Sequence, residues 1–493
     1  MSPALVASLM AISSIVGAYV LLPFRDEDWL RRGLLYWALI TPPLFFGVSL
    51  VVVGLTIAAV MTIVLAPRHS AMLAPFYLLI LFSAPPYVKA TVPFPGLEQL
   101  LTLDYQQVVS LALFIPIAVI NRRDKRFGPE RTASWVLVSI AVYCVIVTAL
   151  AMRATTVTNS LRSGVELGLS TWLLAYLLIK LGRTEGSTSK AFQALLAVAV
   201  VFSVMCIVIQ IRSWNFYSFL DQSERIWKAG EYRFGILRTS VTVNTGLLGF
   251  VCGVGSIICL SNIVRMRSPR KVLLLFLMGL GCLVSLSRGA WLAAMLMVVL
   301  FYLLRSRRSN GTIAGYAIAA CLLIAGVSWI WQGIAIESYD EFGTFSYRQE
   351  IYAASWQQFQ AAPLLGAENY LASGRFDHLV QGEGIIDIVS VYLLIVLRNG
   401  IVGLAFYVLP FALVINGLLK VRKRATRQAG TEPLETSGIL LAAIIGYMMF
   451  IGTTSDVSLV KEVGVILLAL SASFIGAFPR RLPVNVSVRK PAG

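Results

Sequence analysis

Long apolar runs separated by short basic loops are the feature that most constrains the fold of this chain. Fourteen such runs fall at about 4–23, 33–66, 70–86, 105–120, 134–152, 163–179, 191–210, 241–261, 272–286, 291–304, 312–330, 400–419, 437–453 and 459–479. Most are long enough to cross a hydrocarbon core of about 30 Å as a helix. Charged residues make up only 13% of the chain, whereas soluble domains have roughly 25%. The pattern predicts an all-α polytopic membrane protein with about 12–14 transmembrane helices.

The run 33–66 allows two interpretations. Its 34 residues form one long tilted helix, or two short helices broken near Pro42 and Pro43, because a proline pair removes two backbone donors. Counted once, it gives the fourteen runs. The predicted organisation is transmembrane helices over 1–330 with an extracytoplasmic loop near 211–240, a large extracytoplasmic loop with amphipathic helices over 331–399, transmembrane helices over 400–479 and a cytoplasmic tail over 480–493.

Basic residues gather on one side when the runs alternate across the membrane. The loops of that side hold 25 of the 41 Lys and Arg and five acids, a net charge of +20. The opposite side carries 16 bases and 19 acids, a net charge of −3. The positive-inside rule makes the first set cytoplasmic. It comprises Arg68, Arg122 to Arg131, Lys180 to Lys190, Arg265 to Lys271, Arg305 to Arg308, Lys420 to Arg427 and the tail from Arg480. Topology thus explains the formal charge of +17, and we expect no nucleic-acid partner.

Polar chemistry concentrates in two large extracytoplasmic segments, roughly 211–240 and 331–399. Loops of such length in a tight bundle usually carry function. Both mix aromatic rings with arginines and carboxylates, a combination that suits sugar faces, hydroxyls and phosphates. The alternative is an interfacial aromatic belt with solvated charges.

Arg288 is the strongest single candidate for a functional residue. It lies in the segment 285–291 between apolar runs of about 15 and 14 residues, which reach only about 21–23 Å as helices. We therefore expect the turn, with Arg288, to lie below the outer membrane surface. A guanidinium at that depth needs an anionic partner, and a lipid-linked phosphate is a natural one. The alternative is an arginine that reaches the interface or pairs with a carboxylate.

The segment 346–359 has Arg348, Tyr352 and Trp356 at helical spacing and is followed by Pro363 and Gly366. This pattern predicts an amphipathic helix on the outer face. The alternative is that these three residues form a face that only packs against the bundle.

His378 is the extracytoplasmic histidine. Asp377 or Glu383 could orient it as a general base. The alternative is an ordinary surface residue.

Four motifs in order resemble the O-antigen ligase/polymerase superfamily, which includes Wzy-type polymerases and WaaL-type ligases. They are Arg238 just before the run from 241, the element Ser287-Arg288-Gly289-Ala290-Trp291-Leu292, the set Arg348, Trp356, Phe359 and Pro363-Leu364-Leu365-Gly366, and the helix start Asn399-Gly400-Ile401-Val402-Gly403-Leu404. The motifs cover about 230–420, and the remainder of the chain resembles the family in hydropathy.

The sequence departs from the family pattern at two places. The second loop glycine, expected two positions after Gly366, is Glu368. Ligases of the family also carry a histidine ten to twelve positions before the Gly-x-x-Gly element, where this chain has Asp387 in Asp387-Ile388-Val389-Ser390-Val391-Tyr392-Leu393. An acid in this segment is more similar to exopolysaccharide repeat-unit polymerases.

The resemblance implies a GT-C-like architecture and a metal-independent glycosyltransferase without a cofactor. The donor would be an undecaprenyl-diphosphate-linked oligosaccharide, the acceptor a growing glycan, and the active site would face the periplasm or exterior of a bacterial inner membrane. Chain-length regulator and export proteins would be partners. The implied roles are diphosphate binding by Arg288, Arg238 and Arg348, acceptor deprotonation by Asp387 or His378, and glycan binding by Tyr352, Trp356 and Tyr392.

Two other functions stay open at this point. One is ligase-type transfer of a finished glycan to a lipid or protein acceptor. The other is a non-enzymatic lipid-glycan transporter, which would require ionisable residues along the helices. The chain has very few charges within its runs.

Overall fold

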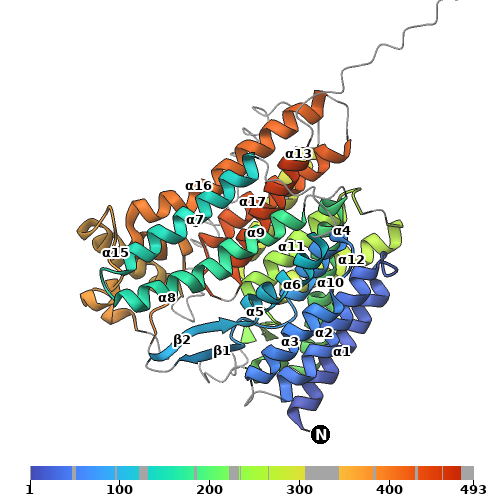
Figure 1. The fold of residues 1–493 in the computed structure, drawn as a ribbon, viewed down its shortest axis with the longest axis horizontal. Coiled ribbons are helices and arrows are strands. Elements are labelled where there is room, and N and C mark those ends of the chain that lie inside the picture. Colours follow the sequence, from blue (N-terminus) through green and yellow to red (C-terminus); the bar gives the residue numbers. More distant parts are fainter. Residues whose placement is uncertain are drawn as a thin grey trace, which may run out of the picture.

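A computed structural model describes residues 2–46, 51–94, 97–121, 131–182, 186–220, 232–233, 235–264, 266–305, 344–380, 385–427, 431–457 and 459–478. The described part is a bundle of helices with two small antiparallel hairpins (Figure 1). Eight of its helical segments are long and apolar enough to cross a membrane, and four more are apolar helices of 10–17 residues. The predicted fold class, an all-α polytopic membrane protein, is confirmed.

The helices of the N-terminal half are α1 (Pro3–Leu21), α2 (Asp28–Phe46), α3 (Val51–Leu65), α4 (Ser70–Leu81), α5 (Tyr105–Ala112), α6 (Phe114–Asn121), α7 (Arg131–Ala151), α8 (Val157–Leu167), the π-helical turn η2 (Gly168–Leu173), α9 (Leu174–Leu181) and α10 (Ser187–Arg212). The next elements are the 3-10 turn η3 (Phe216–Leu220), α11 (Thr245–Leu260), α12 (Ser268–Val284) and α13 (Arg288–Arg305). The C-terminal elements are α15 (Thr344–Ala361), the 3-10 turns η4 (Tyr370–Ser373) and η5 (Asp377–Leu379), α16 (Val391–Arg427), α17 (Thr431–Ile451) and α18 (Val460–Ala477).

The run 33–66 forms two helices, so counting it once was wrong. In the pair α2 and α3, Tyr36 Oη donates to Ala58 O at 3.2 Å, and the side chain of Leu44 lies against Gly54. The two helices are antiparallel, because the contact residue in α3 has a lower number (Gly54 against Ala58) where the contact residue in α2 has a higher one (Leu44 against Tyr36). The two prolines do not break the run, because both lie inside α2, and helices in membranes tolerate proline where neighbours satisfy the freed backbone groups.

This additional helix moves the loop between α1 and α2 to the other side of the bundle. Glu27 in that loop pairs with Lys190 Nζ at 3.5 Å, and Lys190 belongs to the basic loop set. The loop was placed on the acidic side by the sequence, and that placement was wrong. The exchange moves three bases and three acids, Arg25, Arg31, Arg32, Asp26, Glu27 and Asp28, so the balance of +20 against −3 does not change.

The described basic segments after α11, α13 and α16 also meet at this end of the bundle, here called the basic end. Glu435 pairs with Arg305 at 3.2 Å and accepts hydrogen bonds from the main chain and side chain of Asn262. Arg422 is fully buried and donates to Leu304 O. These contacts bring the described basic segments around Asn262, Arg305 and Arg422 together at one end of the bundle.

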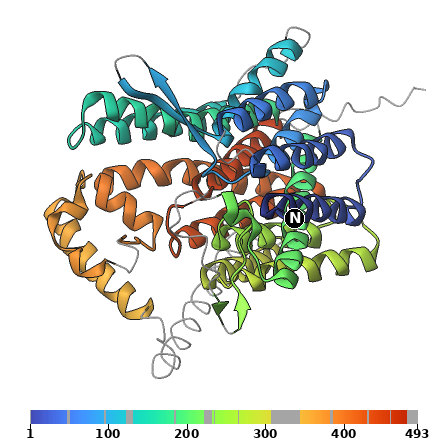
Figure 2. The same ribbon diagram turned by 90° about the horizontal axis from the view of Figure 1, so that it is seen from below.

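The opposite end, here called the site end, carries the hairpin of β1 (Lys89–Phe94) and β2 (Leu97–Asp104). Arg162 in α8 holds this hairpin by donating to Leu100 O at 3.0 Å, and Glu166 accepts from Thr102 N at 2.8 Å. The hairpin, α8 and α15 lie at the same end of the bundle in both views (Figures 1 and 2). The second hairpin pairs β3 (Tyr232–Arg233) with β4 (Ile236–Leu237).

Candidate active site

A tight turn between α12 and α13 presents Arg288 at the site end. Only residues 285–287 separate the two helices, and Leu286 has a left-handed φ of +48°. A non-glycine residue with this φ costs about 1–2 kcal/mol and persists only where its surroundings fix it. Here Trp291 Nε1 donates to Cys282 O at 2.7 Å, and Ser285 Oγ donates to the same carbonyl at 2.7 Å.

Arg288 is exposed at the first position of α13. The residue therefore lies at the end of α13 where helix N–H groups favour an anion. The two helices have 17 and 18 residues, about 26–27 Å, so the turn is less deeply placed than the shorter apolar runs indicated.

The segment that carries Arg238 packs against this turn. Thr239 N donates to Val284 O at 3.1 Å, and Asn215 Nδ2 donates to Arg238 O at 3.0 Å. Arg238 itself is half-buried. The main-chain bond from Thr239 to Val284 brings together the two predicted diphosphate-binding segments, whose arginines are fifty residues apart in the sequence.

Helix α15 covers the segment in which the sequence predicts an amphipathic helix. Arg348, Tyr352 and Trp356 are exposed at intervals of four residues and form one stripe. Ile351 and Ala354 are buried on the other face, in a small core with the segment 370–397. The packing face and the predicted functional face are therefore different sides of the same helix.

The guanidinium of Arg348 lies within electrostatic reach of Arg288 in the α12–α13 turn. Burial by the surrounding segments lowers the pKa of Arg348, the phenol of Tyr352 raises it, and the positive charge of Arg288 lowers it further. The carboxylate of Asp387 raises the pKa of the same guanidinium, and Arg233 lowers it. Three segments distant in sequence thus bring Arg233, Arg288 and Asp387 within electrostatic reach of Arg348.

Asp387 is held by two hydroxyl groups. Tyr347 Oη accepts from Asp387 N at 2.9 Å and donates to Asp387 O at 3.1 Å. Ser455 Oγ donates to Asp387 Oδ1 at 2.5 Å. Burial raises the pKa of Tyr347, which keeps this hydroxyl a neutral donor.

A backbone clamp joins α15 to a break in α16. Gly400 has φ +63° and ψ −165° inside α16, a conformation that essentially only glycine adopts. The broken turn leaves N–H groups without helical partners, and Ile401 N donates to Pro363 O at 3.0 Å. Ala367 N donates to Leu397 O at 2.8 Å. The Pro-Leu-Leu-Gly and Asn-Gly motifs are therefore two halves of one structural joint.

The first departure from the family pattern, Glu368, fits this joint. Glu368, in place of a glycine, pairs with Arg398 at 3.8 Å. Arg153, in the turn after α7, donates to Leu365 O at 2.6 Å. Arg153 and Arg398 thus both bind the loop that follows α15.

His378 and Tyr392 occupy different surroundings from the arginine cluster. His378 is exposed in η5 and has no hydrogen-bond or ion-pair partner among the described residues. Tyr392 lies in the first turn of α16, where its hydroxyl donates to Met448 O at 2.9 Å. Its ring lies 6.4 Å from that of Tyr407. The structure thus gives Tyr392 a packing contact between α16 and α17.

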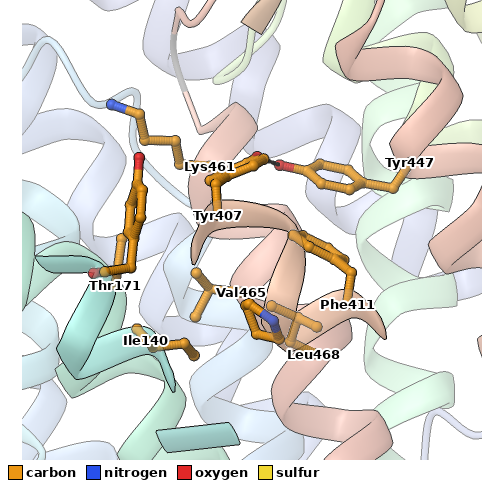
Figure 3. A pocket seen from close by; sticks show the side chains of 10 residues that line it. Ile140, Thr171, Tyr407, Phe411, Tyr447, Lys461, Val465 and Leu468 are labelled. Carbon is orange, nitrogen blue, oxygen red and sulfur yellow. Dashed lines mark hydrogen bonds between the residues drawn. The ribbon is translucent and has the colours of Figure 1, made fainter. Parts of the chain in front are cut away.

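An apolar cavity of about 40 Å³ lies among α7, α16, α17 and α18 (Figure 3). The hydroxyl ends of Tyr407 and Tyr447 point toward each other in it, 3.4 Å apart. Among the described residues that line the cavity, Lys461 is the one cation, and it is paired with Asp456 at 2.6 Å. The cavity therefore lacks the free positive charge that a diphosphate requires, and none of the predicted site residues lines it.

Sequence reasoning did not single out Tyr347, Ser455 or Arg153. The polar run Thr453-Thr454-Ser455-Asp456 between two apolar runs was a signal for Ser455, because short polar loops on a rigid scaffold often carry function. In the part of the chain that the structure describes, no group of three or more His, Cys, Asp or Glu could hold a metal ion.

These elements define a polytopic helical membrane protein with an arginine-rich site at one end of its bundle. Residues 273–408 match the family described as O-antigen ligase, and the segment contains Arg288, Arg348, Asp387 and both halves of the joint. This match supports the O-antigen ligase/polymerase superfamily and indicates a membrane enzyme of the glycan ligase or polymerase type. No curated protein is similar enough to the chain to count as a match.

Proposed function

We propose that the chain polymerises undecaprenyl-diphosphate-linked repeat units into a surface or secreted polysaccharide. The proposal is supported by Arg288 and Asp387 lying within electrostatic reach of Arg348, from three separate segments, and by the hydroxyl of Ser455 holding the Asp387 carboxylate. Such a cluster combines leaving-group stabilisation with a carboxylate able to accept a proton. Polymerisation is favoured over ligation because Asp387 stands where the ligases that the sequence resembles carry histidine.

The arginines act on the leaving group in this proposal. Transfer from the donor breaks the bond between the anomeric carbon and the diphosphate oxygen, and negative charge develops on that oxygen. Arg288, Arg238 and Arg348 stabilise the charge with bidentate, charge-assisted hydrogen bonds. The N-terminus of α13 adds its dipole at the same place. Three guanidinium groups would suffice without a metal, so we propose a metal-independent reaction.

Asp387 takes the proton of the acceptor hydroxyl. Ser455 occupies Oδ1, and the described residues give Oδ2 no partner, which leaves this oxygen for the acceptor. As the proton moves to Oδ2, the acceptor oxygen bonds to the anomeric carbon and the diphosphate departs. His378 is the weaker candidate because no described residue orients it.

The exposed rings of Tyr352 and Trp356 would line the path of the glycan. The Trp356 ring lies 5.5 Å from that of Phe359, which makes a continuous aromatic surface beside Arg348. Such rings offer faces to sugar C–H groups. Tyr392 would contribute indirectly, through its packing between α16 and α17.

The orientation follows from the charge balance. We propose that the basic end faces the cytoplasm and that the site end faces the periplasm or exterior of the inner membrane. Chain-length regulator and export proteins would then meet the polymer at the site end.

A reconstituted assay tests the proposal. The purified chain in vesicles is given lipid-linked repeat units, and the length of the product is measured. We expect Arg288→Ala to abolish product, and Arg288→Lys to restore only part of it because the bidentate geometry is lost. Arg270→Ala is the matched control, since Arg270 is exposed at the basic end of α12. Full activity of Arg288→Ala would refute the proposal.

Ligation is the second candidate, because the matching family is described as O-antigen ligase. Deleting the gene and isolating the cell's glycans separates the two. Single repeat units indicate lost polymerisation, whereas full-length chains retained on the lipid carrier indicate lost ligation.

A further inference from the structure

The connection between α17 and α18 touches three parts of the candidate site. Asn244, the N-cap of α11, donates from Nδ2 to Val457 O at 3.4 Å. A β-carbon added at Gly289 would fall on the side chain of Thr453, so this glycine lets the connection pack directly beside Arg288. Ser455 reaches the third part, Asp387. The connection lies outside the family match at 273–408.

The hydrogen bond from Ser455 is the shortest contact that the structure gives to Asp387. Its 2.5 Å length lies at the short end of the range for a hydroxyl bound to a carboxylate. The Tyr347 hydroxyl fixes the main chain of Asp387 and leaves the carboxylate free to rotate. Ser455 thus provides the contact that sets the direction of Oδ2.

An ion pair anchors the same connection from the other side. Asp456 Oδ2 lies 2.6 Å from Lys461 Nζ at the start of α18, and the Asp456 side chain is only 13% exposed. The Lys461 side chain is 38% exposed, so the pair is only partly shielded from water and contributes a modest anchor for the loop. Ser455 is the residue next to this anchor, so its hydroxyl is presented to Asp387 by a fixed backbone.

We propose that Ser455 is a positioning residue that orients the Asp387 carboxylate toward the acceptor hydroxyl. The inference rests on the proposed function, in which Asp387 accepts the proton. It assigns a role in the active site to a loop that comes from a different part of the chain than the arginines.

The test is a kinetic comparison in the reconstituted assay. Losing one hydrogen bond to a charged group should lower kcat of Ser455→Ala roughly ten- to hundredfold, with little change in the KM for the lipid-linked donor, since the arginines remain. Ser455→Thr keeps the hydroxyl and should recover most of the rate. Ser437→Ala is the control, because its buried hydroxyl bonds only Leu434 O within α17 and should leave the rate unchanged.

A double-mutant cycle separates positioning from a structural role. Asp387→Glu keeps a carboxylate but displaces it from Ser455, so Ser455→Ala should cost little more in that background. Independent, additive losses in the cycle, or full activity of Ser455→Ala alone, would overturn the inference.

Failure of the proposed function has a different signature. If the Arg288→Ala variant forms product at the normal rate, the proposed role of the arginines is contradicted, independently of the results for the Ser455 variants. Full activity of Asp387→Asn removes the base and, with it, the role of Ser455.

Discussion

Replacing Gly366 with alanine tests whether the joint between α15 and α16 holds the site together. Gly366 has a left-handed φ of +64°, and a β-carbon there would lie 2.5 Å from Gly400 N and 2.6 Å from Arg398 C. Both contacts are with backbone, which cannot move aside as a side chain can. The methyl group should therefore push the loop after α15 away from the break in α16.

The free-energy cost of Gly366→Ala has two parts, and alanine substitutions at two other glycines of the chain separate them. A left-handed alanine costs about 1–2 kcal/mol, and an unrelieved clash adds about 1–3 kcal/mol, so we expect roughly 2–5 kcal/mol in total. Gly374 has a similar φ of +73° but its nearest neighbour would be Asp377 Oδ2 at 3.7 Å. Gly374→Ala therefore carries the backbone cost alone. Gly279→Ala, with nothing within 4 Å of its β-carbon, carries neither.

Two measurements decide the outcome. Thermal unfolding of the purified variants should order them as Gly279→Ala, Gly374→Ala and Gly366→Ala from most to least stable. Product formation should fall at least tenfold in Gly366→Ala, because the loop positions Arg348 relative to Asp387. If Gly366→Ala matched Gly374→Ala in both stability and activity, the joint would not be the element that aligns these residues.

Three further outcomes are expected. Arg153→Ala should lower the unfolding temperature, since its guanidinium loses charge-assisted bonds to the carbonyls of Leu365 and Gly366; equal stability of the variant would contradict this anchor. Trp356→Ala should raise the KM for the acceptor glycan roughly three- to tenfold, whereas Trp135→Ala, which removes an equally exposed ring from α7 (60% for both), should not. Treatment with EDTA should leave turnover unchanged, and loss that Mg²⁺ or Mn²⁺ restores would disprove metal independence.

Local sequence signals predicted the helical elements well. Apolar runs identified most of the membrane-spanning helices, and the spacing of Arg348, Tyr352 and Trp356 identified α15 and its exposed face. Both signals depend on residues a few positions apart, and such spacing follows directly from helix geometry. Arg288 was also recognisable, because a charge between two apolar runs is costly unless it has a partner.

Signals that needed a comparison of distant segments were missed. The hairpin of β1 and β2 was not predicted, although Pro95-Gly96 between two extended stretches is a turn signal. The side of the loop before α2 was assigned wrongly because alternation depends on the number of runs. One miscounted run moved the loop, and only the contact of Glu27 with Lys190 corrected it.

The sequence by itself determined that this is a membrane protein, which loops are basic, and which arginines lie outside the apolar runs. These properties are sums over neighbouring residues and do not depend on the path of the chain. Only the tertiary structure decided that Arg288, Arg348, Asp387 and Ser455, the residues of the proposed site, come near one another. Their proximity arises from a left-handed turn, a backbone joint at Gly366 and Gly400, and a loop more than 60 residues from Asp387, because packing between distant helices leaves no periodic trace in the sequence.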